Sequence, residues 1–198
     1  ENEKKGGNYS WFSDVLKESI NTAQKTLLFL NRTGTFRVAV CRDCETLLSQ
    51  DAAECSSCGS AHIVLRGKGI AQLEKECREL FPTKNITRID SERDDPAIRE
   101  QAREADIVIA TERIFRVLPL THFNHIGILS VDHLLVYPHW QAHERVFQLL
   151  VKIFAQNVPL TLQTHAPNHP IIPAAVTNNY QLFRREELAE RTPGVAES

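Results

Sequence analysis

Two Cys-x-x-Cys pairs are the residues of this chain whose types and spacing best suit chemistry. Cys41 and Cys44 form the first pair, and Cys55 and Cys58 form the second after ten intervening residues. Four thiolates so arranged can close a tetrahedron around one Zn²⁺, and the short spacer suits a metal chelate better than a disulfide. Because these ligands leave no coordination position open, the predicted zinc site is structural. Gly59 follows the second pair, and we expect it to take a positive φ that turns backbone amides toward the sulfurs.

The other reactive side chains indicate no catalytic residues. Cys77 falls in line with Ile70, Leu73 and Leu80 at helical spacing, so we expect it to be a small core residue. The histidines show no H-E-x-x-H or comparable ligand spacing. Neither a G-x-x-x-x-G-K-S/T phosphate loop nor a G-x-S-x-G elbow occurs, so the chain alone lacks a standard means of cradling ATP phosphates.

Composition and charge narrow the class of protein. The chain has 198 residues, of which 42% are hydrophobic, and this is enough for a buried core. Its formal net charge is −2, so binding to nucleic acid would need a local basic patch. No apolar run approaches the ~20 residues that span a bilayer, and no signal peptide is evident. We therefore expect a protein of the reducing cytoplasm with no membrane partner.

The cysteine pairs must be positioned by the strands and helices that the rest of the chain forms. Strands are predicted at 27–30, 86–89, 106–111, 125–132 and 158–163, and those at 27–30, 106–111 and 125–132 are expected to be buried. Helices are predicted at 10–23 with Ser10 as the N-cap, 70–81, 95–104 with Asp95 as the N-cap, 139–155 and 171–191. This alternation favours an α/β fold with a mostly parallel sheet flanked by helices. Segments 36–40 and 63–65 lead into and out of the cysteine pairs, so the metal site is expected to be an insert after the first strand.

Ligands of such sheets bind at the carboxyl ends of the strands. The polar residues there are Asn31 with Arg32, Asp90 with Arg93, Thr111 to Arg113, and Asp132 with His133. From the residues alone, a ligand site and a set of solvated loop residues both remain open.

Several stretches together resemble one family, the PriA-type primosomal protein N-prime, a bacterial replication-restart DNA helicase of superfamily 2. The matching stretches include Leu27 to Gly34, Cys41 to Cys44, Cys55 to Ser60, Leu80 to Pro82, Arg88 to Asp90, Ala142 to Arg145, Leu162 to His165 and Glu187 to Arg191. The resemblance implies a RecA-like second helicase lobe at 10–38 and 66–191 with a zinc-ribbon insert at 39–65. It further implies an interlobe linker at 1–9 and a tail at 192–198.

The chain departs from this family in ways that bear on activity. The family usually carries eight cysteines and two zincs in the insert, whereas here only the outer four remain, which implies one structural zinc. The T-Q-M-x-x-K-G motif survives only as Thr111 to Val117. The G-R-x-G-R run, with the arginine that reaches ATP, is replaced by Leu150 to Asn157. Such an arginine is worth about 10³ to 10⁵ in turnover. We expect no ATPase from this chain alone, and ATP as a cofactor only if a first lobe is present.

By resemblance, the chain binds forked or single-stranded DNA at stalled forks, near the nucleoid, and supports primosome assembly with other replication proteins. Contacts to DNA phosphates are expected at Asn31, Arg32, Thr111 and Arg113 on the lobe face, and at Arg42 and Arg66 near the zinc module. The alternative is a non-catalytic, zinc-stabilised scaffold for protein interaction, which the near-neutral charge and the eroded motor motifs favour. Salt-dependent DNA binding separates these two functions.

Overall fold

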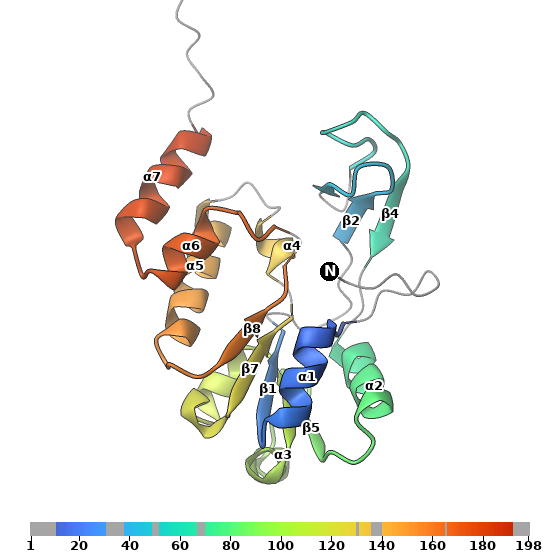
Figure 1. Ribbon diagram of the computed structural model, residues 1–198, viewed down its shortest axis with the longest axis vertical. Helices are drawn as coiled ribbons and strands as arrows, with labels where there is room; N and C mark the ends of the chain where they lie inside the picture. Colours follow the sequence, from blue (N-terminus) through green and yellow to red (C-terminus); the bar gives the residue numbers. More distant parts are fainter. Residues whose placement is uncertain are drawn as a thin grey trace, which may run out of the picture. The chain divides into compact units, whose positions relative to one another are not determined.

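A computed structural model describes residues 11–30, 38–48, 52–66, 70–129, 131–135, 140–164 and 166–191 (Figure 1). The chain divides into two compact units. The first comprises Glu1–Val131 and Val158–Gln163, and the second comprises Asp132–Asn157 and Thr164–Ser198. The five-stranded sheet and the cysteine pairs lie in the first unit.

The main sheet of the first unit is entirely parallel. Its strands are β1 (Thr26–Phe29), β5 (Ile86–Ile89), β6 (Ile107–Ala110), β7 (His125–Ile128) and β8 (Leu160–Leu162). They lie in the order β5-β6-β1-β7-β8. The first strand, β1, is therefore central and pairs on its two edges with β6 and β7, which come much later in the sequence. The predicted α/β fold with a parallel sheet flanked by helices is therefore confirmed.

Helices α1 (Asp14–Thr22) and α2 (Ile70–Leu80) pack on one face of this sheet (Figure 1). Leu16 of α1 and Leu73 of α2 share a buried cluster with Leu28 of β1. Successive residues of a strand point to opposite faces. Phe29 accordingly contacts Phe115, with ring centroids 5.8 Å apart, in the short 3₁₀ helix η1 (Glu112–Arg116). A second 3₁₀ helix, η2 (Leu120–His122), precedes β7.

The caps of two helices were predicted from sequence. Asp95 caps α3 (Pro96–Glu104) as predicted, because its carboxylate accepts the N–H of Ile98 at 2.9 Å. The predicted cap of α1 was wrong, since Ser13 and not Ser10 accepts the first free amide, that of Leu16. Ser10 lies outside the described residues.

The cysteine pairs lie on a second, antiparallel sheet of three short strands. These are β2 (Val38–Cys41), β3 (Leu47–Leu48) and β4 (Ile63–Arg66), in the order β3-β2-β4. Their small core consists of Ala39, Cys41, Leu48 and Cys55. A core of this size cannot hold many apolar side chains, so cross-linking by a metal would add stability that hydrophobic burial does not supply.

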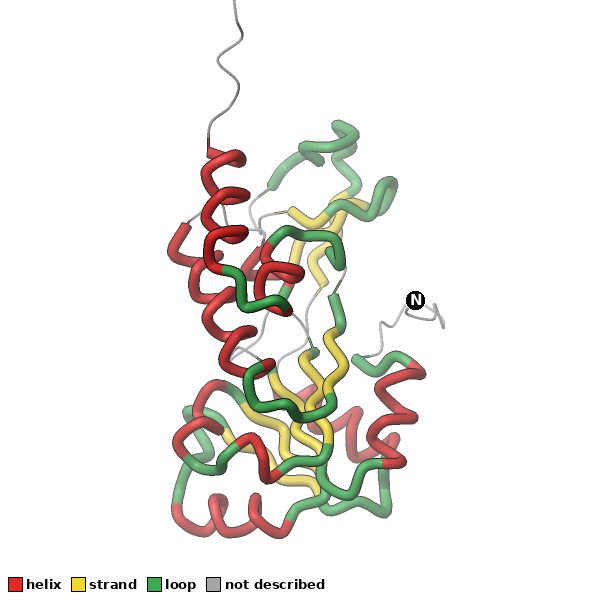
Figure 2. Tube along the Cα trace, turned by 60° about the vertical axis from the view of Figure 1, so that its left-hand side comes forward, coloured by secondary structure: helices red, strands yellow, loops and turns green. Residues whose placement is uncertain are grey.

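The second unit is helical in its described residues. It contains α4 (Asp132–Leu135), α5 (Trp140–Phe154), α6 (Ile171–Val176) and α7 (Tyr180–Arg191), drawn in red in Figure 2. Phe147 of α5 stacks on Phe183 of α7 with ring centroids 4.7 Å apart. The strand predicted at 125–132 is shorter than expected, because its last residue, Asp132, begins α4. Across the described ranges, no helix has the length and apolar character needed to cross a membrane.

Candidate metal centre

The sulfur atoms of Cys41, Cys44, Cys55 and Cys58 all lie within 4.8 Å of one another. Cys41 and Cys58 are 3.5 Å apart at sulfur, and Cys44 and Cys55 are 3.4 Å apart. A Zn²⁺ ion with bonds of ~2.3 Å to four sulfurs requires sulfur separations of about 3.8 Å. Donor type, donor number and spacing therefore fit one tetrahedral metal ion, and the cluster is compatible with a zinc-ribbon insert.

The two cysteine pairs adopt the same turn. The amide of Glu45 donates to the carbonyl of Cys41 at 3.0 Å, and the amide of Gly59 donates to the carbonyl of Cys55 at 2.8 Å. Both donors have left-handed backbones, with φ of 59° at Glu45 and 71° at Gly59. The positive φ predicted for Gly59 is confirmed. Its counterpart at Glu45 was missed, because a glutamate gives no sign of a left-handed conformation.

Hydrogen bonds within the cluster make its thiols unequal. The hydroxyl of Thr46, 3.1 Å from the sulfur, and the Thr46 amide lower the pKa of Cys44 to about 6. The amide of Ser60 acts in the same direction on Cys58, but three neighbouring thiols outweigh it and raise the pKa of Cys58 to about 12. Sulfurs this close resist simultaneous ionisation, so a bound cation is needed for all four to be thiolates.

A polar contact joins the first pair to the residues after the second. The carboxylate of Asp43 accepts the hydroxyl of Ser60, and its Oδ2 lies 3.2 Å from Nδ1 of His62. The Ser60 hydrogen bond and, to a smaller extent, His62 lower the pKa of Asp43. Asp43 therefore holds the two knuckles together on the surface, beside the sulfur cluster.

The strand-end residues Asp90 and Arg93 are brought together, but by a buried charge network. Asp90 is 1% exposed and its Oδ1 accepts the amides of Glu92 at 2.8 Å and Arg93 at 3.0 Å. The Nε of Arg88 lies 2.9 Å from Oδ2 of the same carboxylate. This arrangement shapes the turn after β5.

Glu74 completes this network. Its carboxylate lies 2.9 Å from Arg78, 3.3 Å from Arg88 and 3.3 Å from Arg93. Only 11% of its side chain is exposed. Sequence reasoning missed Glu74, although a signal was present, since it is the one acid on the apolar stripe that Cys77 belongs to.

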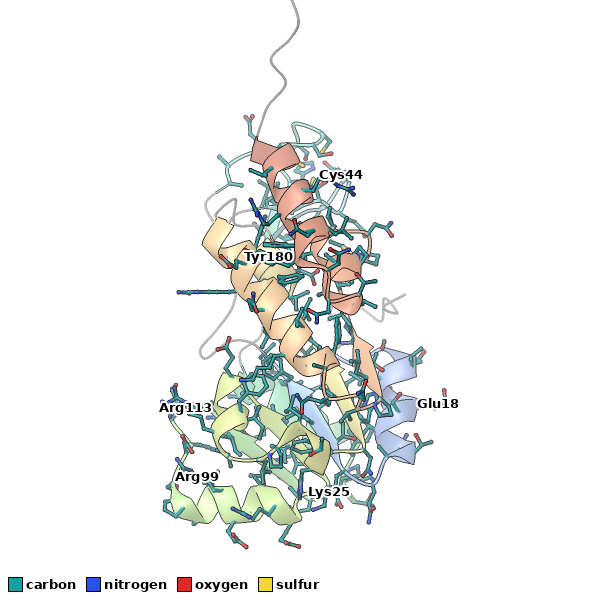
Figure 3. All side chains as sticks on the ribbon, turned by 90° about the vertical axis from the view of Figure 1, so that its left-hand side faces the viewer. Glu18, Lys25, Cys44, Arg99, Arg113 and Tyr180 are labelled. Atoms are coloured by element: carbon teal, nitrogen blue, oxygen red, sulfur yellow. The ribbon has the colours of Figure 1, made fainter. Side chains whose placement is uncertain are left out.

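The predicted contact residues Thr111 and Arg113 differ in accessibility. Thr111 is 5% exposed, and its amide donates to Ile89. Arg113 is 43% exposed, but its guanidinium lies 2.8 Å from the carboxylate of Asp94. Arg99, on the same side of the sheet in Figure 3, contacts the other oxygen at 2.7 Å. Arg99 and then Arg113 lower the pKa of Asp94, which holds both arginines against the turn before α3.

The remaining predicted residues are scattered or not described. Asn31 and Arg32 lie outside the described residues, as do the side chains of Arg66 and His133. Arg42 is exposed directly after the first metal-ligand candidate. Asp132 is 3% exposed and accepts a hydrogen bond from Thr164.

Comparison with known proteins shows what the chain resembles as a whole. It is 27% identical to the replication restart protein PriA of Bacillus subtilis over 96% of its length. This chain resembles the PriA proteins. The PriA proteins of Haemophilus influenzae and Chlamydia muridarum are 26% and 29% identical to it, each over 89% of the chain. No family model matches the chain.

The match covers nearly all of this chain but less than a third of the PriA protein of Bacillus subtilis. The chain spans only 29% of the Bacillus subtilis and Chlamydia muridarum PriA proteins and 30% of the Haemophilus influenzae one. The aligned span covers 96% of this chain, which includes most of the residues of the first and the second unit.

Proposed function

We propose that this chain is the second RecA-like lobe of a divergent PriA-like protein and binds forked or single-stranded DNA in replication restart. The supporting observation is the similarity to PriA over 96% of the chain. In this proposal, residues 10–38 and 66–191 form the lobe, 39–65 form the zinc insert, 1–9 form the interlobe linker and 192–198 form a tail. Its place would be the cytoplasm, near the nucleoid, with primosome or replication proteins as partners.

The metal in this proposal is one structural Zn²⁺ held by Cys41, Cys44, Cys55 and Cys58. Thiolate ligands favour zinc over hard cations such as Mg²⁺ and Ca²⁺. Zinc in such a site contributes folding free energy to the β2-β3-β4 module and offers no open position for a substrate. Its role would be to hold the turn that carries Arg42 against β4, on which Arg66 lies, in one arrangement for DNA contact.

The DNA contacts in this proposal combine the lobe face with the zinc module. Arg113 and Arg42 have the exposure that a phosphate contact requires. Arginine pairs well with phosphate oxygens but reads no sequence when it contacts the backbone alone. Thr111 would act through its position beside Arg113, and Asn31 and Arg32 would extend the same face.

ATP turnover is not proposed for this chain alone. It contains neither a phosphate loop nor the G-R-x-G-R run. A nucleotide would therefore need groups from another polypeptide segment, and ATP would bind only where a first lobe completes the site.

The test is the affinity of the zinc-loaded chain for a forked DNA and for a duplex at low and moderate salt, measured by fluorescence anisotropy. We expect tighter binding to the fork, and an affinity that falls as salt rises because phosphate contacts release counterions. Replacing Arg113 by Glu should weaken binding and reduce the salt slope by about one unit. Arg103→Glu is the matched control, because Arg103 is similarly exposed at 55% but lies in the last turn of α3, at the end of that helix away from Asp94.

A scaffold for protein interaction is the second candidate. Six described arginines form ion pairs with acids, which neutralises much of the positive charge near the sheet. If neither DNA binds at low salt, or if Arg103→Glu weakens binding as much as Arg113→Glu, the placement of DNA on the lobe face is wrong. Absence of all DNA binding would favour the scaffold.

A further inference from the structure

The backbone of the segment that leads into α1 is held by hydrogen bonds to the side chains of Glu76 and Gln163. The amide of Trp11 donates to Oε1 of Glu76 at 3.0 Å. The carbonyl of Trp11 accepts Nε2 of Gln163 at 2.7 Å. The amide of Ser13 donates to Oε1 of the same Gln163 at 2.9 Å. We call residues 11–13 the strap.

Gln163 holds the strap as one residue of a neighbouring strand would. Its single carboxamide supplies one acceptor and one donor to the backbone groups on either side of Phe12. Among uncharged side chains of this length, only glutamine offers both functions on one planar group. A carboxylate could accept from Ser13 but could not donate to Trp11.

The position of this carboxamide is itself fixed by the sheet. The amide of Gln163 donates to the carbonyl of Ile128 at 2.9 Å, which extends the β7-β8 ladder one residue beyond β8. The side chain therefore starts from an anchored backbone, and little further ordering is needed to reach the strap.

The strap in turn sets the start of α1. Phe12 is 2% exposed and packs edge-on against Phe81, with ring centroids 5.7 Å apart. The next residue, Ser13, caps α1 through the amide of Leu16. Displacing the strap would thus remove the cap of α1 and a buried aromatic ring together.

We propose that Gln163 is a latch that fastens the strap, and with it the first turn of α1, to the end of β8. The strap opens as one unit when the latch breaks, while the sheet stays folded. Gln163 is a positioning residue, because it fixes the strap and, through Ser13, the first turn of α1. The proposal uses contacts of the first unit alone and is independent of DNA binding.

The test is amide hydrogen exchange of the full 198-residue chain, zinc-loaded and followed by NMR. In Gln163→Ala, the Ser13 amide should exchange about tenfold faster, because two hydrogen bonds of modest net strength are lost. The amides of β6 should keep their rates. In Gln163→Glu, where one of the two bonds is retained, the Ser13 rate should lie between those of the wild type and Gln163→Ala.

Gln156→Ala is the matched control. Gln156 is a half-buried glutamine just after α5 whose side-chain amide donates to the carbonyl of Lys152, so its loss should leave the Ser13 exchange rate unchanged. An unchanged Ser13 rate in Gln163→Ala would overturn the latch. Equal acceleration of Ser13 and the β6 amides would also overturn it, since that result means uniform destabilisation and no separate opening of the strap.

Discussion

Replacing Glu45 with glycine should strengthen metal binding, whereas replacing Gly59 with alanine should weaken it. The two residues occupy the same position after the second cysteine of each pair, with φ of 59° and 71°. The left-handed backbone is therefore strained at Glu45 and unstrained at Gly59. Glu45→Gly and Gly59→Ala therefore test the same backbone effect in opposite directions within one module.

The magnitude follows from two opposing terms. An L-residue in the left-handed region costs about 1–2 kcal/mol. Glycine loses about 0.5–1 kcal/mol more backbone entropy on folding than alanine does. The net change for each substitution is therefore about 0.5–1 kcal/mol. No atom lies within 4 Å of a Cβ built on Gly59, so its cost comes from the backbone and not from a clash.

Competition with a chromogenic zinc chelator measures this effect, because the binding free energy of a structural metal includes the folding free energy of its module. We expect Glu45→Gly to raise the apparent zinc affinity about two- to fivefold and Gly59→Ala to lower it by a similar factor. The double variant should return close to the wild-type affinity, as independent effects add.

Glu54→Gly is the control for lost charge and added flexibility. Glu54 is exposed in the same module but is not among the residues with positive φ. Its replacement should leave the zinc affinity unchanged or lower it. If Glu45→Gly lowers the affinity as Glu54→Gly does, the left-handed strain at Glu45 does not limit the stability of the site and the reasoning fails.

Three further predictions concern stability, pH and thiol reactivity. Glu74→Ala should lower the free energy of unfolding by about 3 kcal/mol in denaturant titrations, since it removes one of the two buried carboxylates that pair with the buried guanidinium of Arg88. Glu79→Ala, exposed on the same helix, should change it by less than about 0.5 kcal/mol, and equal effects would contradict the network. Burial lowers the pKa of His125, so the unfolded state binds its proton more readily and stability is lost as pH falls below about 6.5. His125→Gln should flatten that pH dependence, and identical profiles for both proteins would refute this. In the metal-free chain at pH 7, a thiol reagent should modify Cys44 quickly and Cys77 only after unfolding, because burial raises the pKa of Cys77 to about 12. Similar rates at both sites would show that Cys77 is accessible.

Local sequence patterns were sufficient to predict most of the helices and strands. The apolar run within 106–111 became β6, because fully buried strands are rich in continuous apolar residues. Asp95 with Pro96 marked the start of α3, since a cap and a fixed φ act within one turn. The helix boundary at Ser13 was missed because the strap that precedes it is held by Glu76 and Gln163, far away in sequence.

The sequence by itself was enough to predict the four-cysteine cluster and the fold class. The first and last cysteines are 17 residues apart in sequence, and two short turns joined by the pairing of β2 with β4 bring their sulfurs together. The tertiary structure alone decided the pairing of Glu74 with Arg88 and of Gln163 with Trp11. Their contacts join segments 14 to 152 residues apart, and no local preference encodes them. Only the sheet order, which places late strands on both sides of β1, brings such residues within hydrogen-bonding distance.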